Sequence, residues 1–223
     1  MSLWRRLLAE WLGTMALLAT VVGSGIMGQT LAGGQVGLAL LANAVATAAI
    51  LYVLICTLGP ISGAHFNPIV TLAFRLRGEL GNLDAICYVL TQLIGAAMGV
   101  LLAHAMFEQS MWQPGIQART GTAQWLSEVV ASAGLILTIM LGLRWRPTAI
   151  PALVACFILA AYWFTASTSF ANPAVTLARS LTQSFAGIRA MDVLPFIGAQ
   201  LLGMLVAMGL VAGLSPREPM TTD

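Results

Sequence analysis

Charged residues are scarce in this chain, and lysine is missing altogether. Only 8% of the 223 residues are charged, whereas 59% are hydrophobic, and all ten basic residues are Arg. The core of a soluble domain cannot use so much apolar sequence, but a protein that crosses a membrane several times must. The net charge of +2 is small and scattered, which argues against nucleic acid as a partner. The composition therefore predicts an integral membrane protein in contact with lipid.

Cysteine and histidine are also rare. The three cysteines, Cys56, Cys87 and Cys156, lie in apolar stretches and lack the spacing of metal ligands. An odd number of cysteines in hydrocarbon favours free thiols and implies no disulfide framework. The sequence shows no cluster of His, Glu and Asp and no pairing of a nucleophile with a base. We therefore expect no metal site, no cofactor and no catalytic residue.

Long hydrophobic runs take the place of these groups. Six segments are long enough to cross a bilayer, which takes about 20 residues. They cover approximately Leu7–Met27, Val36–Leu58, Leu83–Phe107, Ala123–Leu143, Ala149–Phe164 and Val193–Leu214. The first run resembles a signal peptide, but Glu10 lies inside it and a matching Glu128 recurs in the second half. We therefore expect the first run to be a retained span.

The arginines are distributed unequally between the two sides of the predicted membrane. Seven fall on one side, namely Arg5, Arg6, Arg75, Arg77, Arg144, Arg146 and Arg217. Three fall on the other, namely Arg119, Arg179 and Arg189. Because cytoplasmic loops carry the excess of positive charge, both termini are predicted to be cytoplasmic.

A short motif occurs twice between the apolar segments. Asn67-Pro68-Ile69-Val70-Thr71 is repeated as Asn172-Pro173-Ala174-Val175-Thr176, with the two Asn 105 positions apart (172 − 67). Each copy predicts a helix start, because Asn can cap a helix and Pro suits its first position. Each stretch is too short to cross the membrane, so we expect two helices that begin inside it.

The duplication extends beyond this motif. Glu10 is matched by Glu128 at an offset of 118 (128 − 10), and Gln92 by Gln200 at an offset of 108 (200 − 92). Three spans per copy is an odd number, so the second copy must be inverted in the membrane. The chain is therefore predicted to be one channel domain, 1–223, with inverted repeats at about 5–107 and 123–214. In such an architecture, sites form at mid-bilayer where broken helices meet.

These residues resemble the aquaporin and aquaglyceroporin (major intrinsic protein) family. The resemblance is carried by Ala9–Thr14, Ser62–Pro68, Gln92–Ala96 and Asn172–Ala174. It implies an all-α membrane fold of six tilted helices and two re-entrant half-helices. It also implies a homotetramer with one pore per subunit.

The resemblance assigns roles to several residues. Asn67 and Asn172 would donate hydrogen bonds at the middle of the pore, where the two half-helices point their positive ends at each other and repel protons and cations. Glu10 and Glu128 would each brace the re-entrant loop of their own half, because a carboxylate in hydrocarbon needs partners. His65 either faces the cytoplasmic half of the pore or packs as a neutral side chain.

The selectivity filter departs from the family pattern. Most members carry Arg directly after the second Asn-Pro-Ala, where this chain has Val175. Counting back without gaps, the other filter positions map to Thr47 (67 − 20), Ala160 (172 − 12) and Ser169 (172 − 3). All four are small, and none is charged or aromatic, so we expect a wide filter.

Without this Arg, the chain resembles the bacterial aquaglyceroporins associated with arsenic-resistance operons. That resemblance implies a location in a bacterial inner (plasma) membrane. It implies passage of neutral solutes such as arsenite, As(OH)3, and glycerol-like polyols, with methylated arsenicals as further candidates. A water-conducting aquaporin is the alternative. An alternating-access secondary transporter is a second one, because it shares inverted repeats and broken helices. The dominant solute and any gating stay open.

Three residues are assigned by helical spacing. Arg179 is four positions after Val175, on the same face of the half-helix, and either faces the outer vestibule or lies at the interface with headgroups or another subunit. Leu51 and Cys156 lie one turn from Thr47 and Ala160, so they are predicted to form the apolar wall of the pore. Cys156 in that wall predicts inhibition by mercurials.

Overall fold

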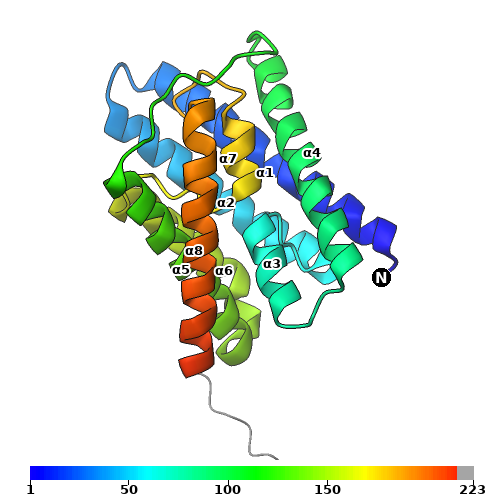
Figure 1. Ribbon diagram of the computed structural model, residues 1–223. Coiled ribbons are helices and arrows are strands. Elements are labelled where there is room, and N and C mark those ends of the chain that lie inside the picture. Colours follow the sequence, from blue (N-terminus) through cyan, green and yellow to red (C-terminus); the bar gives the residue numbers. More distant parts are fainter. Residues whose placement is uncertain (215–223) are drawn as a thin grey trace, which may run out of the picture.

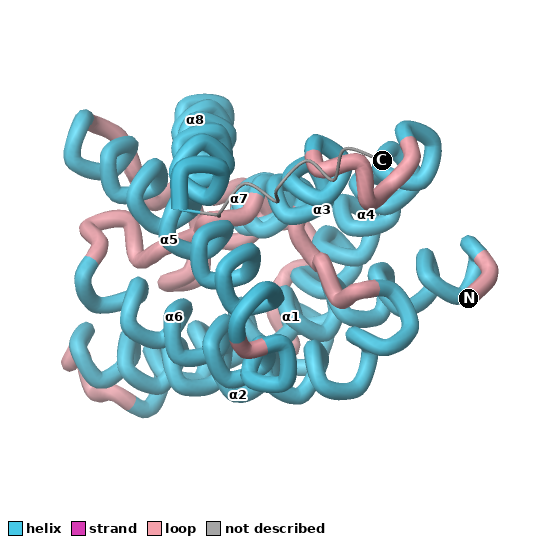
Figure 2. Tube along the Cα trace, turned by 90° about the horizontal axis from the view of Figure 1, so that it is seen from below, coloured by secondary structure: helices cyan, strands magenta, loops and turns pink. Residues whose placement is uncertain are grey.

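The computed structural model describes residues 1–214, and over that range the protein contains helices and no strands (Figure 2). Six helices are long and apolar enough to cross a membrane. They are α1 (Leu3–Leu31), α2 (Val36–Ser62), α4 (Asn82–Met106), α5 (Thr122–Trp145), α6 (Ile150–Phe164) and α8 (Ala190–Leu214). A 3-10 turn, η1 (Pro147–Ala149), precedes α6. The predicted all-α fold with six spans is confirmed.

The two short helices are α3 (Pro68–Leu76) and α7 (Pro173–Arg179), and they begin at the duplicated motif, as predicted. In both halves of the chain the order is therefore two long helices, one short helix and one long helix. α1 packs on α2 and α4, α5 packs on α6 and α8, and α2 packs on α6 between the halves. The short helices contact each other near the middle of the molecule (Figures 1 and 2).

Glycine allows the long helices of each half to cross closely. A Cβ atom at Gly95 of α4 would overlap the carbonyl oxygen of Trp11 in α1. A Cβ atom at Gly203 of α8 would overlap the carbonyl oxygen of Val129 in α5. Helices in lipid associate through such close backbone approaches, since burial of apolar surface cannot drive them together there. The tight crossings place Glu10 and Glu128 directly beside the re-entrant loops.

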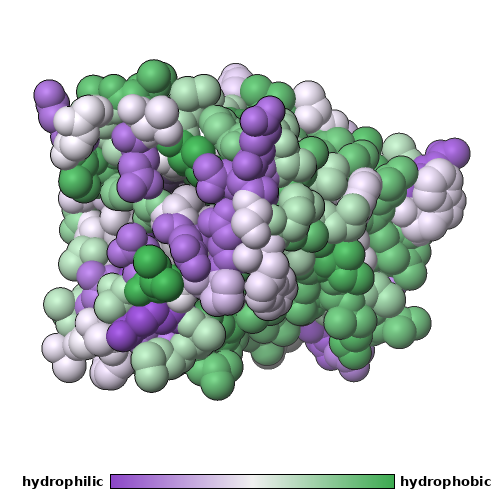
Figure 3. Space-filling view, turned by 90° about the horizontal axis from the view of Figure 1, so that it is seen from above, coloured by the Kyte–Doolittle hydropathy of each residue, from purple (hydrophilic) through white to green (hydrophobic). Residues whose placement is uncertain are grey.

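The polar surface is gathered at the ends of the bundle. Figure 3 views the end that carries the α1–α2, α4–α5 and α7–α8 connections, where hydrophilic residues cluster and apolar residues surround them. Arg119 and Arg189 belong to these connections, whereas Arg75, Arg77, Arg144 and Arg146 lie at the opposite end of the bundle, near the ends of α3 and α5. Arg217, which entered the prediction of orientation, lies outside the described residues. The orientation in the membrane stays a prediction.

Candidate functional site

The duplicated asparagines cap the two short helices. Asn67 precedes α3, and its Oδ1 accepts a hydrogen bond from the backbone amide of Ile69 at 3.1 Å. Asn172 precedes α7, and its Oδ1 accepts from the amides of Ala174 at 2.9 Å and Val175 at 3.2 Å. Proline at the first helical position has no N–H to leave unsatisfied. The asparagine side chains are thereby fixed with their NH2 groups turned away from their own helices.

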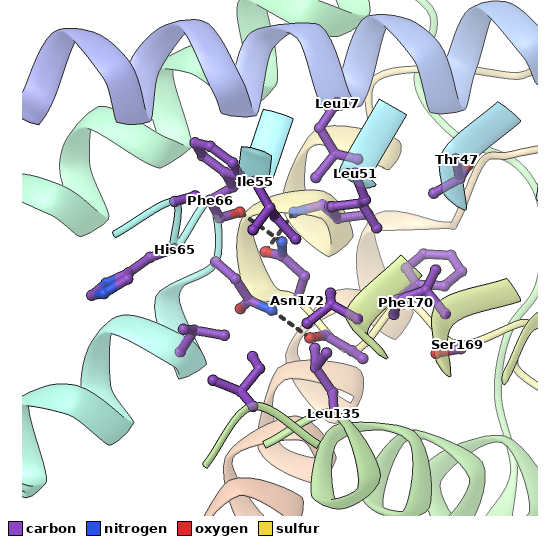
Figure 4. A pocket seen from close by; sticks show the side chains of 18 of the residues that line it. Leu17, Thr47, Leu51, Ile55, His65, Phe66, Leu135, Ser169, Phe170 and Asn172 are labelled. Atoms are coloured by element: carbon purple, nitrogen blue, oxygen red, sulfur yellow. Dashed lines mark hydrogen bonds between the residues drawn. The ribbon is translucent and has the colours of Figure 1, made fainter. Parts of the chain in front are cut away.

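The same asparagines connect the two halves of the chain. Asn67 Nδ2 donates to the carbonyl of Ala171 at 2.8 Å, and Asn172 Nδ2 donates to the carbonyl of Phe66 at 2.8 Å (Figure 4). An asparagine NH2 group carries two N–H donors. Each group uses one of them on the opposite loop within the described residues, which leaves the second for a solute.

Glu10 holds the first re-entrant loop. Its Oε1 accepts from Ser62 Oγ at 2.7 Å and from the amide of His65 at 2.9 Å, while Oε2 accepts from the amide of Phe66 at 2.7 Å. Gln92 Nε2 donates to Oε2 at 2.8 Å. Hydrogen bonds to a carboxylate are about twice as strong as those between neutral groups. The buried Glu10 side chain therefore fixes the loop that presents Asn67.

Glu128 holds the second loop in the same manner. It accepts from the amides of Phe170 and Ala171, both at 2.9 Å, and from Gln200 Nε2 at 2.6 Å. Gln200 also donates to Thr176 Oγ1 at 2.8 Å, just as Gln92 donates to Thr71 Oγ1 at 3.0 Å. Both glutamates are fully buried. All of these contacts are structural, so neither carboxylate is left free for proton transfer.

The two loops share an unusual backbone. The residues one, three and four positions before each Asn all have positive φ. In the first loop they are Phe66 (48°), Ala64 (51°) and Gly63 (90°), and in the second they are Ala171 (46°), Ser169 (51°) and Thr168 (62°). A left-handed residue other than Gly costs about 1–3 kcal/mol and persists only where its surroundings impose it. The glutamate hydrogen bonds supply that constraint.

A cavity of about 210 Å³ runs past both asparagines. A single water needs roughly 10–15 Å³, so the space is ample for small solutes. His65 lies at one end, and Thr47, Ser169 and Phe170 lie at the other, with Leu51 and Asn172 between them (Figure 4). We call these the His65 end and the Thr47 end. Among the described residues, Arg179 is the one Asp, Glu, Lys or Arg side chain in the lining.

Most residues assigned from the sequence line this cavity. They are Thr47, Leu51, His65, Asn67, Ser169, Asn172, Val175 and Arg179. His65 is buried, its Nδ1 lies 3.1 Å from Thr71 Oγ1, and its ring stacks on Phe74 at 4.6 Å between centroids. His65 thus packs against neighbouring side chains and also lines the cavity, while the side of the membrane that it faces stays a prediction.

Two assignments on α6 are wrong. Ala160 and Cys156 are exposed on the outside of the bundle and do not line the cavity. Tyr162, Ile158 and Val154 line it instead. Counting back from Asn172 without gaps placed the filter two residues too early, and two residues correspond to about 200° around an α-helix. The count therefore selected the opposite face of α6.

Tyr162 is the residue that this counting missed. Its side chain is buried, and its hydroxyl oxygen lies 3.2 Å from Thr47 Oγ1. The Thr47 end of the cavity therefore contains an aromatic ring, contrary to the prediction of four small residues. The spacing of apolar residues does not indicate which face of α6 lines the cavity, because nearly every residue of this helix is apolar. The sequence therefore carried little signal for Tyr162.

Two arginines flank Phe170 at the Thr47 end. The guanidinium carbon of Arg179 lies 3.5 Å from the centroid of the Phe170 ring, and that of Arg119 lies 4.8 Å from it. Arg119, in the α4–α5 connection, also donates to the carbonyls of Gly187 at 2.8 Å and Ser167 at 3.2 Å. Burial lowers the pKa of the Arg119 guanidinium. Sequence reasoning gave Arg119 no role beyond orientation, because its loop contacts are not local in sequence.

The arrangement suits the passage of small polar molecules. Hydrogen-bond donors face a mostly apolar cavity at its middle, and a hydroxyl pair and a guanidinium stand at one end. Within residues 1–214 there is no group of three His, Cys, Asp or Glu that could hold a metal ion. The geometry offers solvation for a neutral solute and positive potential against cations.

Known proteins support the same conclusion. A model of the family described as "Major intrinsic protein" matches residues 1–149. The aquaglyceroporin AqpS of Rhizobium meliloti (strain 1021) is 53% identical over 219 residues, which cover 98% of this chain and 94% of that protein. The lens fiber major intrinsic protein of Gallus gallus is 40% identical over 98 residues, 44% of this chain and 36% of that protein.

A solved structure agrees on the fold. The aquaglyceroporin from Plasmodium falciparum superposes with a TM-score of 0.76 over 96% of this chain and 97% of that chain. The two sequences are 19% identical, so this likeness concerns the fold alone.

Proposed function

Since this chain belongs to the major intrinsic protein family and is thus a passive channel and not an enzyme, we propose that it conducts small neutral polar solutes of the aquaglyceroporin class. Arsenite as As(OH)3 and glycerol-like polyols are the proposed solutes, with methylated arsenicals as further candidates. The observation that carries the proposal is Val175, which lines the cavity where most family members have Arg. The extensive identity to the aquaglyceroporin AqpS supports the same solute class.

Tyr162 refines the proposal. Together with Thr47, Ser169 and Val175, Tyr162 makes a filter of one aromatic ring and three small side chains. The residue directly after Asn-Pro-Ala, Val175, carries no charge. The hydroxyl groups of Thr47 and Tyr162 can exchange their mutual hydrogen bond for bonds to a triol. A filter of this kind accepts a solute larger than water, although the ring makes it narrower than four small residues would. Water conduction is the alternative outcome.

Proton exclusion is proposed to rest on the asparagine pair, with Arg179 adding positive potential at the Thr47 end of the cavity. Each NH2 group has one donor held by the opposite loop and one available to the solute, so a water between them would be oriented by donors on both sides. The positive ends of α3 and α7 act in the same direction. Without Arg after the motif, the electrostatic barrier is lower than in a filter that has it.

The proposed setting is a bacterial inner (plasma) membrane, with both termini in the cytoplasm. The Thr47 end then opens to the outside. A homotetramer with one pore in each subunit is proposed, and the exposed apolar faces of the long helices are available for lipid and for neighbouring subunits. A reporter fused to the C-terminus tests the orientation, because it should be accessible only from the cytoplasm.

Stopped-flow measurements on proteoliposomes test the solute class. The panel comprises water, glycerol, a larger polyol, arsenite and methylated arsenicals, each with the wild type, Val175→Arg and Tyr162→Ala. We expect Val175→Arg to lower glycerol and arsenite flux by about tenfold or more, and Tyr162→Ala to favour the larger polyol. Ala160→Ser, on the opposite face of α6, is the matched control and should change nothing. Water flux without glycerol or arsenite flux would contradict the proposal.

The same vesicles distinguish a channel from an alternating-access transporter. A coupled transporter needs an ionisable group in the membrane for its ion. Glu10 and Glu128 are occupied by four and three hydrogen bonds respectively, so they offer no such group. We expect flux that rises linearly with the solute gradient and is independent of proton and sodium gradients. Saturable, ion-driven flux would favour the transporter.

A further inference from the structure

The two terminal nitrogens of Arg179 are used neither by the fold nor by the proposed neutral pathway. Arg179 is 2% exposed and lines the cavity. Its Nε donates to the carbonyl of Ala186, and within residues 1–214 its two terminal nitrogens make no hydrogen bond. Nor does any carboxylate of that range form an ion pair with it. A buried guanidinium normally has a counter-charge, because removing it from water is costly.

Two carboxylates of the second half of the chain, Glu128 and Asp192, are already engaged. Glu128 accepts from the amides of Phe170 and Ala171 and from Gln200. Asp192 forms an ion pair with Arg189 at 3.0 Å and accepts from the backbone amide of Arg119. The terminal N–H groups of Arg179 are therefore left facing the cavity with no fixed acceptor.

A second group at the same end is also unsatisfied. Ser169 is 3% exposed and lines the cavity, and its Oγ has no hydrogen-bond partner among the described residues. Figure 4 shows Ser169 beside Phe170, the ring on which Arg179 lies. Buried hydroxyl groups are rarely left without a partner. At the Thr47 end of the cavity, two residues of the lining therefore have donors without an acceptor.

The equivalent position in the first half explains why Arg179 faces inward. Each Asn is followed seven residues later by a side chain that stacks on the residue two positions before the Asn. In the first half this is Phe74 on His65 at 4.6 Å, and in the second half it is Arg179 on Phe170 at 3.5 Å. Phe74 and Arg179 both line the cavity. The placement of Arg179 is thus part of the repeated architecture, and its charge is the difference.

We propose that the Thr47 end of the cavity is a binding site for a small monoanionic oxoacid, such as nitrate or formate. The terminal N–H groups of Arg179 and the hydroxyl of Ser169 donate to its oxygens. The planar guanidinium presents paired donors that match a planar oxyanion. Arg119 acts as a positioning residue, because it holds Phe170, the ring on which Arg179 lies. The inference rests on the proposed function for its location in the solute pathway.

Competition with a neutral solute is the first test. Glycerol flux is measured in proteoliposomes of the full-length protein at increasing nitrate concentrations. Nitrate replaces a bulky anion, so that the ionic strength stays constant. Nitrate should slow glycerol flux in the wild type in a saturable manner. Arg179→Gln should abolish the effect, Arg179→Lys should retain part of it, and Ser169→Ala should raise the half-effective nitrate concentration about three- to tenfold.

The control is Arg189→Gln, which removes a charge at the same end of the bundle from a residue outside the cavity lining. It should leave the nitrate effect unchanged. Equal inhibition of the wild type and Arg179→Gln, or no inhibition of the wild type, would overturn the site. Should Arg179→Gln fail to assemble, Ser169→Ala and Arg179→Lys decide, because the Ser169 hydroxyl has no partner to lose and Lys keeps the charge.

A binding measurement separates this inference from the proposed function. In detergent, nitrate should raise the unfolding temperature of the wild type and of Arg189→Gln, but not that of Arg179→Gln. If no glycerol or arsenite passes in any variant, the solute class fails while this shift still tests the anion site. If the solutes pass but nitrate causes no shift and no competition, the anion site fails and the channel function stands.

Discussion

The His65 end and the Thr47 end of the cavity have the same arrangement of stacked side chains but are lined by different residue types. At each end a ring lies over the residue seven positions after the Asn and beside an aromatic residue of the following long helix. His65 lies 5.3 Å from Tyr88, and Phe170 lies 5.3 Å from Phe196, between ring centroids. The residue seven positions after the Asn is Phe74 in one half and Arg179 in the other. The bracing is shared and the lining is not, so selectivity can change without altering the scaffold.

The shared bracing should produce the largest effects. Glu10→Ala leaves four buried donors without an acceptor, and Glu128→Ala leaves three. Each lost partner costs about 1–3 kcal/mol. We expect both variants to lose most of their folded protein, with Glu10→Ala the less stable of the two by about one hydrogen bond.

Thermal unfolding in detergent and the yield of assembled protein measure this. Glu10→Gln and Glu128→Gln are the matched controls, since an amide keeps the size and one acceptor oxygen. They should be intermediate. Wild-type stability in either Ala variant would mean that the loops do not depend on these carboxylates.

The difference between the two ends can be removed by one substitution. Arg179→Phe copies Phe74 into the second half, where the ring can stack on Phe170 as Phe74 stacks on His65. One charge at 4 Å is worth about 4 kcal/mol at an effective dielectric constant of 20. Losing it should raise sodium or proton leak by about tenfold or more while glycerol flux persists. Leak is measured with a pH-sensitive dye in proteoliposomes, and an unchanged leak would assign cation exclusion to the Asn pair alone.

A smaller effect is expected where the two loops differ in backbone chemistry. Four positions before the Asn, the first loop has Gly63 at φ 90° and the second has Thr168 at φ 62°. Gly63→Thr should destabilise the protein by about 1–2 kcal/mol, because a β-branched residue disfavours positive φ and its Cβ would also approach His65 Nε2 at 3.2 Å. Thr168→Gly should be neutral or stabilising by up to about 1 kcal/mol.

The comparison fails if both substitutions shift the unfolding temperature in the same direction. Gly37, which follows the start of α2, provides a control site, because a Cβ atom added there would meet nothing within 4 Å. The shift in unfolding temperature of Gly37→Ala should therefore report the effect of adding a Cβ atom at a site without loop strain. The expected order of stability is therefore Thr168→Gly, then wild type, then Gly63→Thr.

Much of this architecture could be predicted from the sequence, because its strongest signals are local. The six apolar runs and the Asn-Pro helix starts depend on composition and spacing within short segments, and the paired glutamates follow from the repeat of those segments. Tyr162 could not be predicted, since α6 is apolar on all sides and a count from Asn172 back through the loop that follows α6 decides which face is inside. Arg119 could not be predicted either, because its contacts to Ser167 and Gly187 join segments far apart in sequence.

The smallest effect is expected for a substitution on the face of α6 that does not line the cavity. Cys156 is exposed on the outside of the bundle, so Cys156→Ser should leave glycerol flux and its response to mercurials unchanged. Tyr162→Cys, on the face that lines the cavity, should instead create a block by mercurials that a thiol reductant reverses. A wild-type block that disappears in Cys156→Ser would return this residue to the pore and contradict the assigned face. Absence of a block in Tyr162→Cys, with the thiol shown to react, would mean that position 162 leaves the solute pathway open.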